Sequence, residues 1–93
     1  MIYAIASLSI ENADKLATYR EHAGQALARH GGQVLTASAA PLGIEGAPTL
    51  PDAVAILSFP DRESGLNWIN DPDLADVHDL RRAAGQSEIT LLG

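Results

Sequence analysis

The chain has 93 residues, no cysteine, and a formal net charge of −6, and no apolar run is long enough to span a bilayer. This length predicts one domain over residues 1–93, without disulfide or thiolate chemistry. The acidic balance argues against binding to nucleic acid or to an anionic membrane. Residues 1–10 lack a basic leader and a cleavage-site pattern, so we expect a cytoplasmic protein.

The first third of the chain predicts a strand, a helix and a second strand. Residues 2–10 alternate with period two and predict the first strand. Asn12 is a suitable N-cap for a helix over residues 13–30. Gly31-Gly32 ends this helix, because glycine adopts the left-handed conformation at little cost. Residues 33–39 then predict the second strand.

A long loop precedes the clearest strand. Residues 40–51 contain three prolines and two glycines and predict a loop longer than a hairpin requires. Loops of this length often serve as lids or as interface arms. Residues 52–59 predict a strand, which Pro60 closes because proline cannot donate a ladder hydrogen bond.

The last third predicts two short helices and a final strand. Asp61 can cap the first helix, which runs to Asn70. Asp71-Pro72 opens a second helix that ends near Gly85, and residues 87–92 form the last strand. The order β-α-β-β-α-β is typical of a ferredoxin-like α+β fold, with helices on one face of a four-stranded antiparallel sheet.

Both faces of this sheet carry apolar side chains. Val54 and Ile56 lie on one face of their strand and Leu57 and Phe59 on the other. Helices can cover only one face, and an antiparallel sheet with a solvated face should have polar residues there. We therefore expect a homodimer that packs sheet to sheet. The alternative is an open face with scattered small apolar residues, which are common on protein surfaces.

With this layout the chain resembles the DUF1330 family. The most specific match is the run from Phe59-Pro60 through Trp68 and Asp71-Pro72 to Leu80-Arg81. Further matches along the chain are Tyr19, Gly31-Gly32, Glu45-Gly46 and Leu92-Gly93. The resemblance implies a dimeric α+β barrel and leaves the activity open, since the family is largely uncharacterised.

The chain departs from that family at three positions. Ala37 and Ala53 stand where the family usually carries arginine, and Leu74 stands where an aromatic residue is usual. If those arginines hold an anionic group in relatives, this chain lacks them. We therefore expect a different or less charged ligand.

A narrower similarity concerns Trp68 and His78. Their spacing is similar to that in haem-degrading monooxygenases, where the histidine ligates iron and the tryptophan packs beside the porphyrin. In those proteins an asparagine stands on the first strand, where this chain has Ser7. The region also loosely resembles antibiotic-biosynthesis monooxygenases, which oxidise polyketide-like aromatics without metal or flavin.

The candidate catalytic residues are two histidines and a tyrosine. His78 could act as a general acid or base, since the pKa of histidine lies near neutrality. The alternative is a half-exposed histidine on a polar helix face. His22 lies three residues after Tyr19 and shares its helix face, so the pair could relay a proton. The alternative is a packed Tyr19 beside a solvated His22.

A bound ligand is expected to contact five further side chains. These are Tyr3, Ser7, Trp68, Arg81 and Glu45, with Trp68 as a wall of the pocket. The aspartates between residues 71 and 79 lack the spacing of a calcium loop, and no nucleotide-binding motif is present. We therefore expect no metal and no cofactor.

These features together predict a small homodimeric enzyme with a pocket between sheet and helices. It would act without a cofactor on a neutral aromatic or polyketide-like molecule, by acid–base isomerisation, cyclisation or elimination, or by monooxygenation. The first alternative is a non-catalytic ligand-binding or structural dimer. The second is a haem-binding monooxygenase that uses His78.

Overall fold

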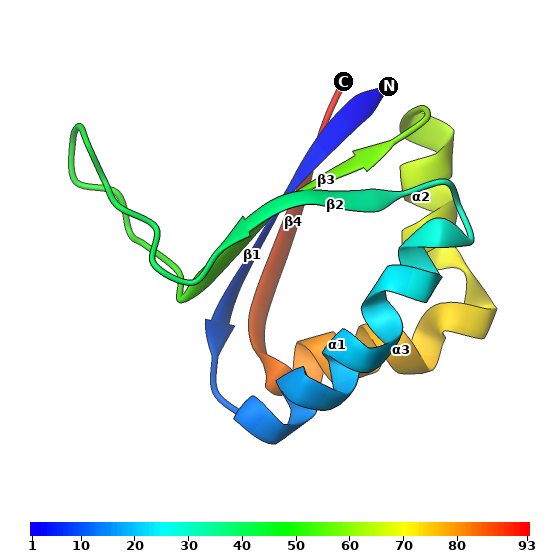
Figure 1. Cartoon of the computed structure of the whole chain (residues 1–93), viewed down its shortest axis with the longest axis horizontal. Helices are drawn as coiled ribbons and strands as arrows, with labels where there is room; N and C mark the ends of the chain where they lie inside the picture. Colours follow the sequence, from blue (N-terminus) through cyan, green and yellow to red (C-terminus); the bar gives the residue numbers. More distant parts are fainter.

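The computed structural model describes residues 1–93, with helices against one face of a four-stranded antiparallel sheet (Figure 1). This arrangement confirms the ferredoxin-like α+β fold. The elements in chain order are β1 (Ile2–Ile10), α1 (Ala13–Ala28), β2 (Gln33–Ser38), β3 (Ala53–Phe59), α2 (Arg62–Asn70), the 3₁₀ helix η1 (Pro72–Leu74), α3 (Ala75–Ala84) and β4 (Gly85–Leu92). No helix is both long and apolar enough to cross a membrane.

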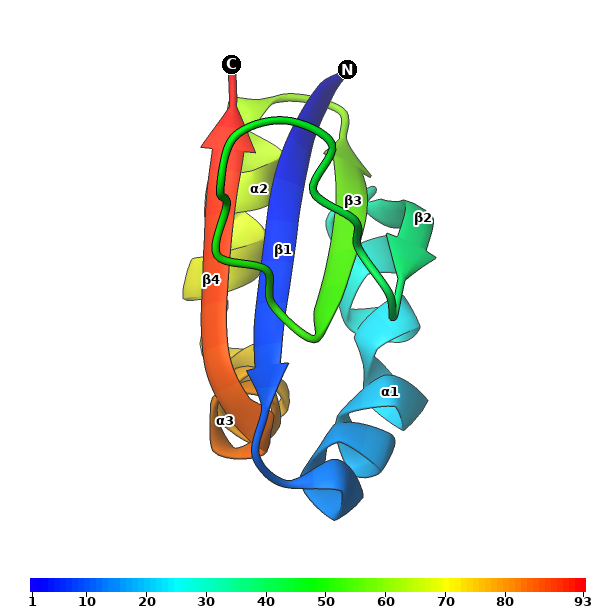
Figure 2. The ribbon, with the colours of Figure 1, turned by 90° about the vertical axis from the view of Figure 1, so that its left-hand side faces the viewer.

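The strand order is β2-β3-β1-β4, so β1 is a central strand. Ile5 of β1 pairs with Ile56 of β3 on one side and with Thr90 of β4 on the other. Tyr3 pairs with Leu92, which brings the two ends of the chain to the same end of the sheet (Figure 2). Successive residues of β1 therefore alternate between the helix-covered inner face and the opposite, open face.

Two predicted boundaries differ from the structure for local reasons. The first helix ends at Ala28 instead of residue 30, where Gly31 takes a φ of 71° and Gly32 N donates to Leu27 O at 2.8 Å. The helix expected from Pro72 begins as the 3₁₀ turn η1, and α3 continues from it.

The last strand begins at Gly85 instead of residue 87, so α3 passes into β4 without a loop. A Cβ atom on Gly85 would lie 1.9 Å from the backbone oxygen of Ser9. Only glycine therefore permits the close approach of β4 to the end of β1. The same junction is held by Ala84 O, which accepts from Glu11 N at 2.8 Å.

The core lies between the helices and the inner face. Its centre is Phe59, whose ring centroid is 5.6 Å from that of Trp68. Ala4, Ala26, Leu27, Leu57 and Leu74 complete this cluster. A smaller cluster of Leu8, Leu16 and Ala84 lies apart from it. The inner-face side chains come from alternate positions of β1 and β3, as predicted.

The loop of residues 40–51 forms an arm that projects on the side of the sheet away from the helices (Figure 1). Leu42 and Ile44 at the arm are 81% and 92% exposed, so they have no cover within their own chain. The base of the arm is fixed, because Ile10 N donates to the Asp52 carboxylate at 2.8 Å.

Candidate functional site

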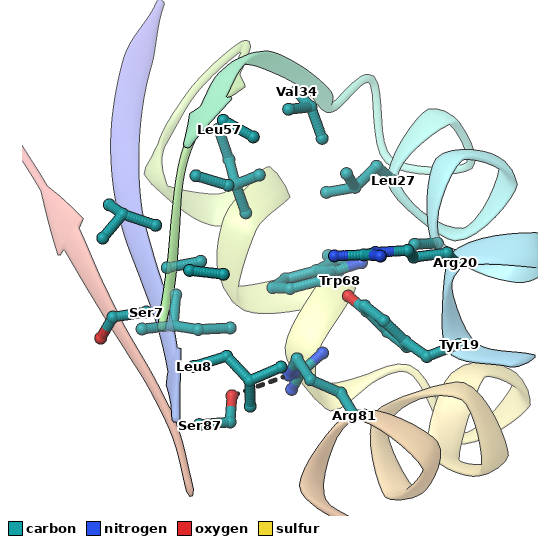
Figure 3. Close-up of a pocket in the computed structure, with 17 residues that line it drawn as sticks. Ser7, Leu8, Tyr19, Arg20, Leu27, Val34, Leu57, Trp68, Arg81 and Ser87 are labelled. Carbon is teal, nitrogen blue, oxygen red and sulfur yellow. Dashed lines mark hydrogen bonds between the residues drawn. The ribbon is translucent and has the colours of Figure 1, made fainter. Parts of the chain in front are cut away.

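A cavity of about 200 Å³ lies between α1 and the inner face of the sheet (Figure 3). Its lining is mostly apolar, and short side chains on facing elements create the space, namely Ala6, Ala23, Ala37, Ala53 and Ala55. For comparison, a dry apolar cavity of about 150 Å³ holds a benzene molecule. The cavity is thus large enough for one substituted aromatic ring or a compact enone.

Arg81 of α3 supplies the charge in this apolar space. The residue is only 5% exposed, and it lines the cavity. The ion pairs of the chain involve Arg29, His30 and Arg82 instead. A buried cation without a counter-charge is strongly destabilising, so natural proteins rarely keep one without a function. This guanidinium is the strongest indication of a binding site in the structure.

Two polar side chains fix the orientation of that guanidinium. Arg81 Nε donates to Ser87 Oγ at 3.1 Å, and Nη1 donates to His78 Nδ1 at 2.8 Å. Arginine has five N–H donors, so these two bonds leave other donors free. The guanidinium carbon also lies 5.4 Å from the ring centre of Trp68 and 5.7 Å from that of Tyr19. A ligand oxygen would therefore meet a cation that is already positioned.

His78 lies directly behind Arg81 and is buried, with 1% of its surface exposed. Its Nδ1 must accept, because arginine can only donate, and its Nε2–H therefore donates to Trp68 O at 2.8 Å. Burial lowers the pKa of His78, and the charge of Arg81 acts in the same direction. The imidazole is thus neutral, with both nitrogens occupied, and serves to position Arg81.

This arrangement leaves His78 without a free lone pair for a proton or for iron. The haem alternative would require the imidazole to abandon both Trp68 and Arg81. No group of three or more metal-ligating side chains occurs elsewhere in the structure.

Trp68 forms one wall of the cavity and is 3% exposed. Its ring lies edge-on to the His78 imidazole, with centroids 4.8 Å apart. The indole Nε1–H is buried and finds no acceptor in the chain. A buried unpaired N–H costs about 1–3 kcal/mol. A side chain in the wall of the cavity therefore carries one hydrogen-bond donor without a partner.

Tyr19 and Arg20 line the α1 side of the cavity. Figure 3 shows the Tyr19 hydroxyl and the Arg20 side chain gathered beside the Trp68 indole. Tyr19 is half-buried, whereas Arg20 is exposed and so marks the mouth of the cavity. The structure thus brings Tyr19, Trp68 and Arg81 together, three of the residues expected from sequence.

The other predicted site residues lie elsewhere. His22 is exposed on α1 and does not line the cavity, so it is not placed to exchange a proton with a ligand there. Tyr3 is on the open face, and Glu45 is exposed in the arm. Ser7 borders the cavity, but Figure 3 shows its hydroxyl directed away from it. The side chains of Tyr3, Ser7 and Glu45 are thus not directed into this cavity.

Sequence reasoning did not single out Arg20 or Ser87. The only available signal for Arg20 was its position next to Tyr19, and Ser87 stood at a predicted strand start without a recognisable motif. Ala37 and Ala53 both line the cavity. Two of the three positions at which the chain departs from the family pattern are therefore part of this site, whereas Leu74 lies in the core cluster.

A family model for a domain of unknown function, DUF1330, matches residues 1–93. The chain belongs to the DUF1330 family. No curated protein matches its sequence. This DUF1330 member is similar to a protein of unknown function from Rhodopseudomonas palustris, RPA0582, with 22% identity and a TM-score of 0.80. The alignment covers 98% of this chain and 79% of that one.

Two further structures share the fold of this DUF1330 protein. One is a dimeric ferredoxin-like protein of unknown function from Jannaschia sp. CCS1, with 12% identity, coverage of 99% and 97% of the two chains, and a TM-score of 0.71. The other is SnoaB, a cofactor-independent oxygenase from Streptomyces nogalater, with 12% identity, coverage of 99% and 90%, and a TM-score of 0.66. At these identities the likeness establishes the fold alone.

Proposed function

We propose that this protein binds a small, mostly apolar molecule with one acidic oxygen, and promotes its ionisation to an enolate or phenolate without a cofactor. The observation that carries the proposal is the buried guanidinium of Arg81, which faces an apolar cavity and has no acidic partner. A negative oxygen on the ligand would supply the missing counter-charge.

The apolar lining and the cation together narrow the kind of ligand. The sequence predicts a neutral ligand, because alanines replace two family arginines, but Arg81 provides positive charge from another element. A molecule that enters neutral and loses its proton once bound suits both features. The lining favours the neutral form during entry, and a nearby guanidinium lowers the pKa of a bound acid.

The cavity lacks a strong base of its own. Its titratable lining residues are Tyr19, Arg20 and Arg81, and His78 behind them is neutral and occupied. The substrate must therefore be acidic enough to ionise mainly through stabilisation of its anion. Phenols and methylenes activated by two carbonyl or aryl groups have this property, and many polyketide-like aromatics contain them.

Such an anion can react without a cofactor. In an oxygenation, the activated methylene loses both hydrogens, one atom of O₂ becomes a new carbonyl oxygen, and the other leaves as water. The fold likeness to a cofactor-independent oxygenase supports this class of reaction. In a cyclisation, the same carbanion would instead attack a carbonyl carbon of its own molecule, so that a C–C bond forms while the C=O π bond opens to an alkoxide, which takes up a proton from water.

Deuterium exchange tests the shared step. A β-dicarbonyl or anthrone-type probe in D₂O should exchange its activated hydrogens faster with protein, and an oxygen electrode would show whether O₂ is then consumed. Arg81→Gln should reduce the exchange rate by about 10²-fold or more. Arg82→Gln removes the same charge from a side chain that is 55% exposed and should change little. Equal exchange by the Arg81 variant and wild type would refute the proposal.

A non-catalytic binding protein is the second candidate, and the lack of a free base in the cavity favours it. Quenching of the single tryptophan, Trp68, reports binding directly. Saturable, Arg81-dependent quenching without deuterium exchange or O₂ uptake would identify this alternative.

We further propose that the open face of the sheet packs against a second copy of the chain. Tyr3 and Leu92 on that face are 43% and 45% exposed, and the arm adds Leu42 and Ile44. The similar protein from Jannaschia sp. CCS1 is described as dimeric, which supports a homodimer here. Light scattering at micromolar concentration should give twice the mass of 9.8 kDa, and a monomer mass would refute this assembly.

A further inference from the structure

The indole N–H of Trp68 has no function in the fold. It is buried, and no group of the chain accepts its hydrogen bond, while the Trp68 side chain lines the same cavity as Arg81. The Trp68 carbonyl, by contrast, is used by His78. The backbone of Trp68 is therefore occupied in positioning the cation, while its side chain offers a second, unused donor.

The two donors belong to side chains that line one small space. The Arg81 guanidinium carbon is 5.4 Å from the Trp68 ring centre, and both side chains line the 200 Å³ cavity (Figure 3). A ligand with a single oxygen at Arg81 would leave the indole N–H unpaired. A ligand with a second acceptor near the first would satisfy both donors at once, which increases affinity and fixes its orientation.

We infer that the ligand is a conjugated anion whose charge is shared by two oxygens on alternate carbons, as in a β-dicarbonyl enolate or a 2-acylphenolate. One oxygen binds Arg81 and the other accepts from Trp68 Nε1. This inference rests on the proposed function and specifies its substrate class. A carboxylate also has two oxygens, but it is ionised and strongly hydrated before entry, and a mostly apolar lining penalises it.

Three probes with one ring each separate these cases. They are 2′-hydroxyacetophenone with the paired oxygens, phenol with one acidic oxygen, and benzoate. Trp68 is the only tryptophan, so a ¹H–¹⁵N spectrum contains one indole N–H signal. With 2′-hydroxyacetophenone this signal should move downfield, and its hydrogen exchange should slow. Affinity should exceed that for phenol by about tenfold, the usual worth of one added charge-assisted bond.

Two variants make the test independent of folding defects. Trp68→Phe removes the N–H and should bring the affinities for 2′-hydroxyacetophenone and phenol close together. Arg81→Gln keeps the indole signal and should weaken both ligands, whereas Arg82→Gln should not.

The outcomes separate this inference from the proposed function. If the indole signal moved equally with phenol, or if phenol and 2′-hydroxyacetophenone bound with equal affinity, Trp68 would not bind a second acceptor. The proposed binding at Arg81 would still hold as long as Arg81→Gln weakened both ligands. If benzoate bound most tightly of the three probes, the inferred ligand class of conjugated anions with oxygens on alternate carbons would be wrong. Failure of all three probes to bind would overturn both the inference and the proposed function.

Discussion

The Nδ1 atom of His78 lies 2.8 Å from Nη1 of Arg81, so the imidazole accepts a hydrogen bond from a group that can only donate. This contact fixes the tautomer of the histidine without any observation of hydrogens. It also gives the histidine a structural task at the site where sequence suggested proton transfer. This contact and other features of the fold lead to testable predictions.

The first concerns the role of His78 in positioning Arg81. His78→Asn keeps an acceptor oxygen close to the place of Nδ1, whereas His78→Leu removes it at similar volume. We expect ligand affinity to fall by about tenfold or more in the leucine variant and less in the asparagine variant, since an unpaired guanidinium reorients. Titration of Trp68 fluorescence measures both. Equal losses in the two variants would argue for a purely structural role.

The same histidine predicts an acid-sensitive stability. Burial lowers the pKa of His78 in the folded chain below the usual value of about 6.5. Because the unfolded chain then binds a proton first, the contribution to stability is complete above about pH 6.5 and is lost as pH falls toward the folded-state pKa. Urea unfolding from pH 7.5 to 5 should show this slope in wild type. A His78→Asn protein with the same slope would disprove it.

A second prediction concerns Gly85. Gly85→Ala places a methyl group on the backbone oxygen of Ser9, so β4 must separate from β1. We expect loss of cooperative folding, or a fall in unfolding free energy above about 4 kcal/mol, an effect reserved for such severe lesions. Gly24→Ala is the matched control. Apart from the chain neighbours and the backbone of its own helix, no atom lies within 4 Å of the added methyl, so Gly24→Ala should stabilise α1 by about 0.5–1 kcal/mol. Thermal melts of both variants decide the matter.

The third prediction concerns Asp71, which links α1 to η1. Its carboxylate bonds His30 Nε2 at 2.8 Å and lies 3.0 Å from Arg29 Nε. The His30 contact holds the pKa of Asp71 below its usual value, so its contribution to stability is present above about pH 4 and is lost below it. Asp71→Asn should lower the melting temperature at pH 7, and it should reduce the further loss of stability that the wild type shows below about pH 4.

Asp79→Asn provides the control for that experiment. Asp79 is 71% exposed and meets Arg82 only at 3.5 Å, so its loss should be nearly neutral. Differential scanning calorimetry at pH 3 to 7 compares the two variants. A larger effect at Asp79 than at Asp71 would contradict the assigned link.

The fourth prediction concerns the arm. If the arm contacts a partner subunit, replacing Leu42 and Ile44 together by serine should weaken the dimer, because both side chains lack cover within the chain. Sedimentation over a dilution series measures the change. Leu66→Ser alters a leucine on α2 that is 44% exposed and should leave the assembly intact. An unchanged dimer in the double variant would exclude the arm from the interface.

The fold was predictable because its signals are local. Asn12, Asp61 and Asp71 accept hydrogen bonds at helix starts, as capping residues should, and period-two alternation marked the strands. The last strand was predicted to start at residue 87, two residues too late. Since β4 follows α3 directly, no separate loop marks its start in the sequence.

The site was less predictable, since α3 buries polar residues. His78, Arg81 and Ala84 lie three apart and form the buried side of the helix. In sequence they stand among Asp76, Asp79 and Arg82, so the helix looks polar all round. Hydropathy therefore could not reveal a buried guanidinium, which depends on cavity shape and on partners such as Ser87 from another element.

The pairing of Tyr3 with Leu92 has a consequence for how the gene could be rearranged. A short linker could join residue 93 to residue 1, and new termini could open within the arm of residues 40–51. The permuted chain would begin with β3 and end with β2, which are neighbours in the sheet, so every strand pair would persist. Such a circular permutant would sever the arm while leaving the cavity intact, and would show whether the two can be separated.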